Sequence, residues 1–380
     1  MDQAIQHKAL YMEAFKMKTL KNIIKFLTFL GILIFLLNTS SKIFTPKWRS
    51  GKGQGQTDTI SGFYSLPKNS IDLLFLGDSS IYKSISPMEV YEKSGIVSYN
   101  YSVSSARIYT FYYLLQDVLK YQKPKIVMID PLTLFYDEKE IEPERRKSFD
   151  YMRFGKAKWN MINADVYENE TFDKLSYVFP IFRYHDRYNK INSKEIKNTF
   201  AAQTSPTRGF VVSSRVSPNY NGFKYMTPNG ETVKMKDYTV KYLDLFIELC
   251  KNNNIKLIVV GVPDTRAWNY EKNEYLKNYL LERKVEYLDL NNESVGINWL
   301  EDTEDGGMHF NILGAEKITS YITQYLVKNY NLPDRSNDNQ INLELEKYNK
   351  LKKKHKDWLL YKIKYKKYDS TKKSNAKKSN

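Results

Sequence analysis

Short apolar runs alternate with helix-spaced segments along two stretches of the chain, and this alternation is the strongest constraint on its fold. The runs expected to be strands are 71–76, 97–102, 126–129, 255–262 and 285–290. The segments with helical spacing are 87–94, 108–122, 238–252, 271–283 and 313–329. Strands that alternate with helices favour a parallel sheet covered on both faces. The sequence therefore predicts an α/β domain.

The segment Ile23–Phe44 is mostly apolar and long enough to span a bilayer. Lys16, Lys18, Lys21 and Lys25 precede it, and basic residues stay on the cytoplasmic side. No small-residue cleavage site follows it. We expect an uncleaved signal anchor, with residues 1–22 in the cytoplasm and the main domain outside. A cleaved signal peptide or a buried helix are the alternatives.

The rest of the chain divides by composition. Residues 45–70 are expected to be a linker and 71–332 the α/β domain. The domain carries an insertion at 132–236, polar and aromatic, which follows a strand end and is expected to lie over the active-site side. Residues 333–380 form a Lys-rich tail.

The tail holds most of the formal net charge of +16, because residues 347–380 contain 14 Lys against Asp357 and Asp369. A basic amphipathic helix on an anionic membrane is one interpretation, and contact with an acidic wall polymer is another. A solvated, disordered charge run is the third. Nucleic acid is not an expected partner, since the export signal puts the tail outside the cytoplasm.

The first strand run ends in Gly77-Asp78-Ser79-Ser80, a tight turn that lifts a hydroxyl out of the sheet. A plain strand-to-helix turn is the alternative. Of four histidines, His7 precedes the apolar segment and His355 lies in the tail, which leaves His185 and His309 for the domain. His309 stands in a loop beside acidic residues, where a carboxylate can orient its ring.

This pattern predicts a Ser/His/Asp site that pairs Ser79 with His309, with an orienting carboxylate from Asp302, Glu304 or Asp305. One Cys and two usable His do not supply a standard zinc site, and no phosphate-cradling Gly loop is present. We therefore expect neither a metal nor another cofactor.

These segments resemble the SGNH/GDSL hydrolase family over about residues 71–131 and 238–329. Gly77-Asp78-Ser79 matches the nucleophile block, and Asp305 to Ala315, with His309 inside, matches the closing block. The family usually places the Asp three residues before the His, and Asp305 stands four before it and Asp302 seven before, so the resemblance implies Asp305 as the acid with Asp302 in reserve. The resemblance implies a three-layer α/β/α, flavodoxin-like sandwich. The family's second block has Ser here, and Asp130 stands where the third block usually has Asn.

By resemblance the backbone N–H groups of Ser79 and of Ser102 or Ser105 hold the oxyanion. Candidate substrate-binding residues are Asp78, Asn100, His185, Arg187 and Asn311. His185 and Arg187 stand in a motif that looks like a feature of the membrane-anchored branch, although a surface or packing role is the alternative for them.

That branch is found with bacterial genes for cell-envelope polysaccharides. The resemblance implies a single-pass protein of the bacterial cell membrane, a serine esterase or O-acyltransferase that acts on acyl esters of an envelope glycan. A membrane-bound acyl-transfer partner is implied as well. Two alternatives stay open, a catalytically inactive scaffold of this fold and a basic binding protein that works through its tail.

Overall fold

A computed structural model describes residues 2–47, 56–136, 139–167, 173–200 and 205–369. Parts of the expected linker (48–55) and of the expected tail (370–380) lie outside the described residues. The chain forms two compact units. One holds the N-terminal helix together with a piece of the expected insertion, and the other holds the sheet and the C-terminal helices.

The first unit is built on α1 (Asp2–Phe44), whose 43 residues make a helix about 65 Å long. Within the described residues, Gln6–Phe44 is the one helical stretch long and apolar enough to cross a membrane. Short helices pack against it, namely α9 (Ile181–Tyr184), η3 (His185–Asn189) and α10 (Ser193–Phe200), and α8 (Lys174–Val178) packs against α9. The Ile181 N–H donates to Ser41 Oγ at 3.2 Å. This part of the expected insertion thus belongs with the N-terminal helix, a pairing that local sequence does not encode.

The second unit contains a five-stranded parallel sheet in the order β2-β1-β3-β4-β5. The strands are β1 (Leu73–Leu76), β2 (Ser98–Asn100), β3 (Ile126–Ile129), β4 (Lys256–Gly261) and β5 (Glu286–Asp289). Phe75 of β1 pairs with Asn100 on one side and Met128 on the other. In this flavodoxin-like order the connections change direction between β1 and β3, where open α/β sheets bind ligands beyond the strand ends.

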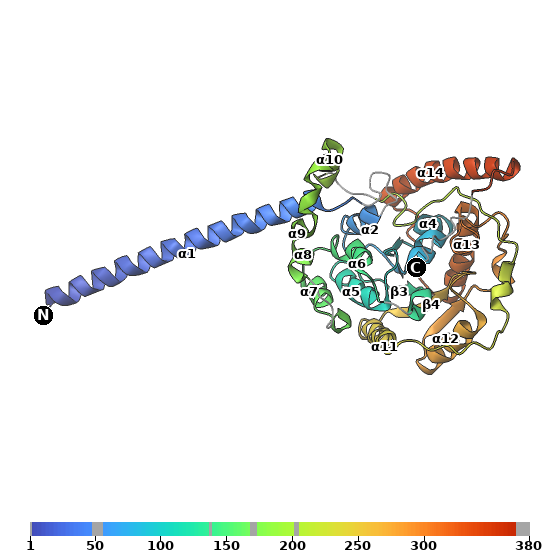
Figure 1. Cartoon of the computed structure of the whole chain (residues 1–380), viewed down its shortest axis with the longest axis horizontal. Coiled ribbons are helices and arrows are strands. Elements are labelled where there is room, and N and C mark those ends of the chain that lie inside the picture. The colour runs from blue at the N-terminus through green and yellow to red at the C-terminus, as the bar shows by residue number, and fades with distance from the viewer. Residues whose placement is uncertain (1, 48–55, 137–138, 168–172, 201–204, 370–380) are drawn as a thin grey trace, which may run out of the picture. The chain divides into compact units, whose positions relative to one another are not determined.

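Helices cover both faces of the sheet, so the predicted three-layer fold is confirmed (Figure 1). One face packs alternate strand residues, such as Phe75 and Met128, against α3 (Ser79–Ser84), α4 (Pro87–Ser94) and α13 (Ile312–Asn329). On the other side α5 (Ile108–Val118) packs against α11 (Asp237–Asn252), which contacts β4. A further helix, α12 (Tyr270–Glu282), contacts β5. Each of these helices except α3 coincides with a segment that the sequence predicts to be helical.

Short elements complete the second unit. They are α2 (Gln56–Phe63), η1 (Leu132–Phe135), α6 (Glu142–Phe149), α7 (Lys156–Ile162), η2 (Asp165–Tyr167), η4 (Gly222–Met226) and η5 (Glu293–Val295). In α2, Ile60 and Phe63 are buried, and the Phe63 ring contacts the rings of Tyr99 and Tyr101. The fold thus begins before residue 71, inside the expected linker, because two apolar residues suffice to dock a two-turn helix.

The tail forms a docked helix, α14 (Asn339–Lys364), that contacts α4 and α13. Its apolar residues Ile341, Tyr348 and Leu359 are buried. The Tyr348 hydroxyl donates to Glu89 at 2.9 Å, and Lys352 Nζ lies 3.2 Å from the same carboxylate. The tail is a helix through Lys364 rather than a disordered charge run, but its buried residues pack on the fold and supply partners to Glu89, so its contact with a membrane stays a prediction.

Candidate active site

The serine turn follows β1 directly. Gly77 is required there because a Cβ at this position would clash with the Ile81 side chain. Asp78 caps α3 by accepting the Ser80 N–H at 2.7 Å, and Ser79 is the first residue of that helix. The Val103 N–H donates to the Gly77 carbonyl at 2.9 Å, which ties the loop after β2 to the turn. Tight packing on both sides therefore fixes the position of the Ser79 hydroxyl.

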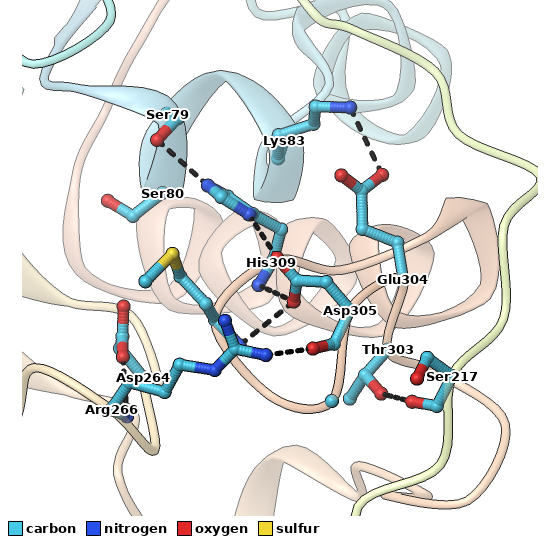
Figure 2. Close-up of polar contacts among 12 residues, drawn as sticks. Ser79, Ser80, Lys83, Ser217, Asp264, Arg266, Thr303, Glu304, Asp305 and His309 are labelled. Atoms are coloured by element: carbon cyan, nitrogen blue, oxygen red, sulfur yellow. Dashed lines mark hydrogen bonds and ion pairs between the residues drawn. The ribbon is translucent and has the colours of Figure 1, made fainter. Parts of the chain in front are cut away.

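His309 lies within hydrogen-bond distance of both expected partners (Figure 2). Its Nε2 is 2.8 Å from Ser79 Oγ, and its Nδ1 is 2.7 Å from Asp305 Oδ2. Asp305 Oδ1 also accepts the N–H groups of Met308 at 3.2 Å and His309 at 3.0 Å. An ionised carboxylate only accepts, so Nδ1 carries the ring proton and Nε2 is left to accept from the serine hydroxyl.

The charges of the site favour an ionised Asp305. Burial raises the pKa of Asp305, but the hydrogen bonds and positive charge of His309 outweigh it and hold this pKa below its usual range. For His309, burial lowers the pKa, yet Asp305, with the charges of Glu304 and Asp78, brings it above the ordinary imidazole value. The side chains of His309 and Asp305 keep 16% and 20% of their surface exposed, so the pair remains within reach of a substrate.

The reserve acid Asp302 has a structural task instead. Its Oδ2 accepts from Lys317 Nζ at 2.6 Å and from the Asn298 N–H at 2.6 Å. Asn311 is the N-cap of α13, and its side chain also donates to the Glu301 carbonyl at 2.6 Å. Both residues shape the loop that carries Asp305 and His309 without contacting either side chain.

Two other substrate-binding candidates also have structural partners. Asn100 is fully buried and donates through Nδ2 to the carbonyls of Ile81 at 3.2 Å and Ile85 at 3.1 Å. Asp78 accepts the Tyr136 hydroxyl at 2.9 Å in addition to capping α3. Their contacts hold the floor of the site around the serine turn.

His185 and Arg187 belong to the unit built on α1. Arg187 pairs with Glu195 at 2.8 Å and donates to the carbonyl of Phe44, the last residue of α1. His185 Nδ1 lies 3.1 Å from the carbonyl oxygen of Phe182. These contacts match the packing alternative for the two residues.

The oxyanion candidates differ in backbone conformation. Ser105 has φ of 64°, in the left-handed region that favours glycine. Its carbonyl accepts from Arg107 at 2.5 Å. Ser102 is buried directly beyond β2. Strained backbone of this kind clusters at functional sites, so Ser105 is the better candidate of the two.

Three carboxylates follow neighbouring strands; the sequence analysis named Asp78 and Asp130 singly but missed Asp264 and the grouping of the three. Asp78 follows β1, Asp130 follows β3 and Asp264 lies beyond the end of β4, and all three are buried. A strand end followed closely by Asp was the available signal. Burial, and then the charge of Asp78, raise the Asp130 pKa well above its ordinary value, while Ser80 and the Leu132 N–H donate to Asp130. Burial raises the pKa of Asp264 to about 6.

Charged neighbours brace the loop tip (Figure 2). Lys83 pairs with Glu304 at 3.0 Å, and the Arg266 guanidinium donates to the Asp305 carbonyl. Among the described residues, Glu304, Asp305 and His309 are the one group with donor atoms close enough, within 4.8 Å, for a metal. A metal would have to displace the Asp305–His309 and Lys83–Glu304 contacts, so the geometry fits proton transfer better.

Comparisons with known proteins find only distant likenesses. No family model matches the chain, and no curated protein matches its sequence. Among solved structures, a protein of Desulfitobacterium hafniense assigned to the G-D-S-L lipolytic family is 13% identical with a TM-score of 0.34, covering 66% of this chain and 97% of that one. A protein of Bacteroides fragilis assigned as an acylhydrolase is 14% identical with a TM-score of 0.35, covering 70% and 92%. The properties of the site therefore rest on its own geometry.

Proposed function

We propose that this protein is a membrane-anchored serine esterase or O-acyltransferase of the SGNH type that acts on acyl esters of a cell-envelope polysaccharide. The observation that carries the proposal is the continuous chain of contacts from Ser79 Oγ through the His309 ring to the Asp305 carboxylate. A hydroxyl, an imidazole and a carboxylate in this order form the arrangement that activates a serine for acyl transfer.

In the first half-reaction Ser79 Oγ attacks the ester carbonyl carbon while its proton passes to His309 Nε2. Asp305 stabilises the imidazolium that forms and keeps the ring oriented. The N–H groups of Ser79 and of Ser105 or Ser102 donate to the oxyanion. When the tetrahedral intermediate collapses, the bond to the alkoxide breaks, His309 returns the proton to that oxygen, and the acyl group stays on Ser79.

In the second half-reaction an acceptor hydroxyl attacks the acyl-serine. His309 takes the acceptor's proton, the ester bond to Ser79 breaks, and the proton returns to Ser79 Oγ. Water as acceptor gives deacylation, and a sugar hydroxyl gives transfer. His309 carries one proton from Ser79 to the leaving alcohol and one from the acceptor back to Ser79, so the protons balance over the cycle and no diffusible cofactor is needed.

The proposed location rests on α1, with Lys16, Lys18, Lys21 and Lys25 on the N-terminal side of its apolar stretch. Positive residues stay cytoplasmic, which puts the catalytic unit outside. Alkaline phosphatase fused after residue 380 is expected to be active in intact cells. A reporter that fluoresces only in the cytoplasm, fused at the same position, is expected to stay dark. The reverse pattern would contradict the orientation.

The proposed partner of α14 is an anionic surface, either of the membrane or of a wall polymer. Its buried residues Ile341, Tyr348 and Leu359 face the fold, and lysines and aromatic rings, with Leu343 and Leu360, make up much of its outer face. The exposed lysines and aromatic residues of α14 and its C-cap are Lys347, Lys350, Lys353, Lys354, Trp358, Tyr361, Lys364 and Tyr365. Salt-sensitive binding to phosphatidylglycerol vesicles, absent with phosphatidylcholine, is the expected result for the membrane case.

A catalytically inactive scaffold is the second candidate, with a membrane-bound acyltransferase as its partner. Asp78 and Asp264 favour it, because buried carboxylates close to His309 oppose the negative charge that develops on an oxyanion. Reactivity of Ser79 separates the two candidates.

The deciding experiment measures hydrolysis of p-nitrophenyl acetate by the detergent-solubilised full chain, beside Ser79→Ala and His309→Ala. The esterase proposal expects turnover by the wild type and a loss of at least about a thousandfold in each variant. A folded wild type without turnover would support the scaffold.

A further inference from the structure

A segment of the expected insertion lies along the loop that carries Asp305 and His309. We call residues 213–219 the strap. The Ile312 N–H donates to the Ser213 carbonyl at 2.9 Å, and the Asn219 N–H donates to the Trp299 carbonyl at 2.8 Å. The strap therefore meets the chain both before and after the acid and base residues.

The loop itself is a small hairpin, residues 302–311, with Asp305 and His309 near its tip. The Asn311 N–H donates to the Asp302 carbonyl at 2.9 Å, and the Glu304 N–H donates to the His309 carbonyl at 3.0 Å. Between these contacts Thr303 and Phe310 form an antiparallel bridge. Moving one strand of this hairpin thus moves the Asp305–His309 pair.

The middle of the strap is bound to the hairpin at Thr303 (Figure 2). The Ser217 N–H donates to the Thr303 carbonyl at 2.9 Å, and the Thr303 hydroxyl donates back to the Ser217 carbonyl. Thr303 is completely buried and stands two residues before Asp305. Asn219 Nδ2 adds a bond of 3.0 Å to the Gly306 carbonyl at the tip. The strap thus fixes the outer edge of the hairpin.

The chain reverses direction after α14 and then reaches the strap. Beyond α14, Lys366 adopts φ of 51°. The Lys366 N–H donates to the Ile363 carbonyl at 3.0 Å and the Lys367 N–H to the Lys362 carbonyl at 2.8 Å. These are the two bonds of a Schellman motif, which ends a helix and reverses the chain. The reversal brings Asp369 to the strap.

Asp369 binds the strap at Val216, the residue next to the one that binds Thr303 of the hairpin. Its N–H donates to the Val216 carbonyl at 2.7 Å, and its Oδ2 accepts the Val216 N–H at 2.9 Å. Lys362 Nζ holds the same carboxylate at 2.8 Å. Val216 is completely buried and adjoins Ser217, the residue bound to Thr303.

We propose that Asp369 is a positioning residue for catalysis, which acts through the strap on the hairpin and holds Asp305 and His309 in register with Ser79. The inference rests on the proposed function, since it concerns the same three residues. It makes the C-terminal segment part of the active enzyme.

The test compares Asp369→Ala with Asp357→Ala in the detergent-solubilised full chain. Asp357 is the matched control, because it also belongs to the C-terminal segment, on α14, and makes an exposed pair with Lys353 at 2.8 Å. We measure kcat and KM for p-nitrophenyl acetate per active site, counted by complete labelling with a fluorophosphonate probe. Thermal unfolding is recorded for each variant.

Asp369→Ala is expected to lower kcat per labelled site about ten- to a hundredfold, the effect of misplacing reacting groups by a fraction of an ångström to one ångström, with KM little changed. The acid limb of the pH profile is expected to shift to lower pH. This follows because burial continues to lower the His309 pKa while the opposing contact with Asp305 loosens. A loss of packing alone would lower the fraction of protein that the fluorophosphonate labels. It would leave the acid side of the pH profile where it is in the wild type.

Thr303→Val provides a second variant, since it removes the hydroxyl bond to Ser217 without changing the volume of the side chain much. The two substitutions break one connected path, so the double variant is expected to lose less than the product of the single losses. Asp369→Ala with the kcat and pH profile of Asp357→Ala would overturn the positioning role. A wild type that neither turns over the ester nor takes the probe would overturn the proposed function instead.

Discussion

Replacing Asp305 by asparagine tests whether this carboxylate orients His309. The substituted side chain would keep an oxygen for the N–H groups of Met308 and His309, so the loop should fold unchanged. Its amide nitrogen would then face Nδ1, which lies 2.7 Å from Oδ2 in the wild type. Two donors cannot meet at that distance, so the ring proton must move to Nε2, and the histidine can no longer accept the proton of Ser79.

The expected loss in kcat is roughly 10³–10⁴-fold, the size of a wrong-tautomer effect in a Ser-His-Asp site. At 1.36 kcal/mol per factor of ten this corresponds to about 4–5 kcal/mol of transition-state stabilisation. The acid limb of the pH profile should move to lower pH, because the lowering effect of burial on the His309 pKa is no longer opposed by the Asp305 charge.

The assay is kcat and KM for p-nitrophenyl acetate from pH 5 to 9, with Asp302→Asn as the matched control. Asp302 binds Lys317 and the Asn298 N–H, so its replacement should lower the melting temperature and leave kcat within a few-fold. If Asp305→Asn kept kcat within tenfold of the wild type, or if Asp302→Asn lost as much, the assignment of the orienting acid would be refuted.

Three further predictions concern pH and packing. In the wild type, kcat/KM should fall on the acid side with an apparent pKa above the ordinary 6.5 of imidazole, because His309 must be neutral to accept a proton. Asp305 raises the pKa of His309 by more than burial lowers it, and a midpoint below 6.5 would contradict this. Gly77→Ala should abolish ester turnover and lower the melting temperature, since the added methyl clashes with Ile81. The control, Gly230→Ala at an exposed position, should lower the melting temperature far less despite the positive φ, because nothing lies within 4 Å of the added methyl. Lys352→Met should destabilise the fold by about 3 kcal/mol by leaving Glu89 buried without its cation. Burial already raises the pKa of Glu89, so its contribution to stability is lost as pH rises through that pKa, and the effect of Lys352→Met in chemical denaturation should be larger at pH 8 than at pH 5.

The sequence predicted the sheet and its main helices because their apolar periodicity is local. The predicted helix 87–94 matches α4, and the predicted strand 126–129 matches β3. It predicted the pairing of Ser79 with His309, 230 residues apart, from the scarcity of histidine and the resemblance of the two blocks. The geometry then gives the tautomer and the role of Asp302, which depend on distances that no spacing encodes.

The parts that the sequence did not predict depend on contacts between distant segments. The strap is a polar stretch without periodicity, and only its backbone bonds to residues near 303 reveal its place. The tail has the composition of a solvated charge run, yet Tyr348 and Lys352 dock it on the buried Glu89. Asp264 follows β4 without any chemical motif, and its burial beside the site appears only in three dimensions.

The most direct test of the central claim locates the nucleophile chemically. The full chain is labelled with a fluorophosphonate, digested, and the modified residue is identified by tandem mass spectrometry, beside Ser79→Ala and Ser80→Ala. Ser80 is the neighbouring hydroxyl, buried and bonded to Asp130. A serine hydrolase predicts the adduct on Ser79, its loss in Ser79→Ala and its persistence in Ser80→Ala. A folded chain that takes no label, or takes it on another residue, would contradict the account.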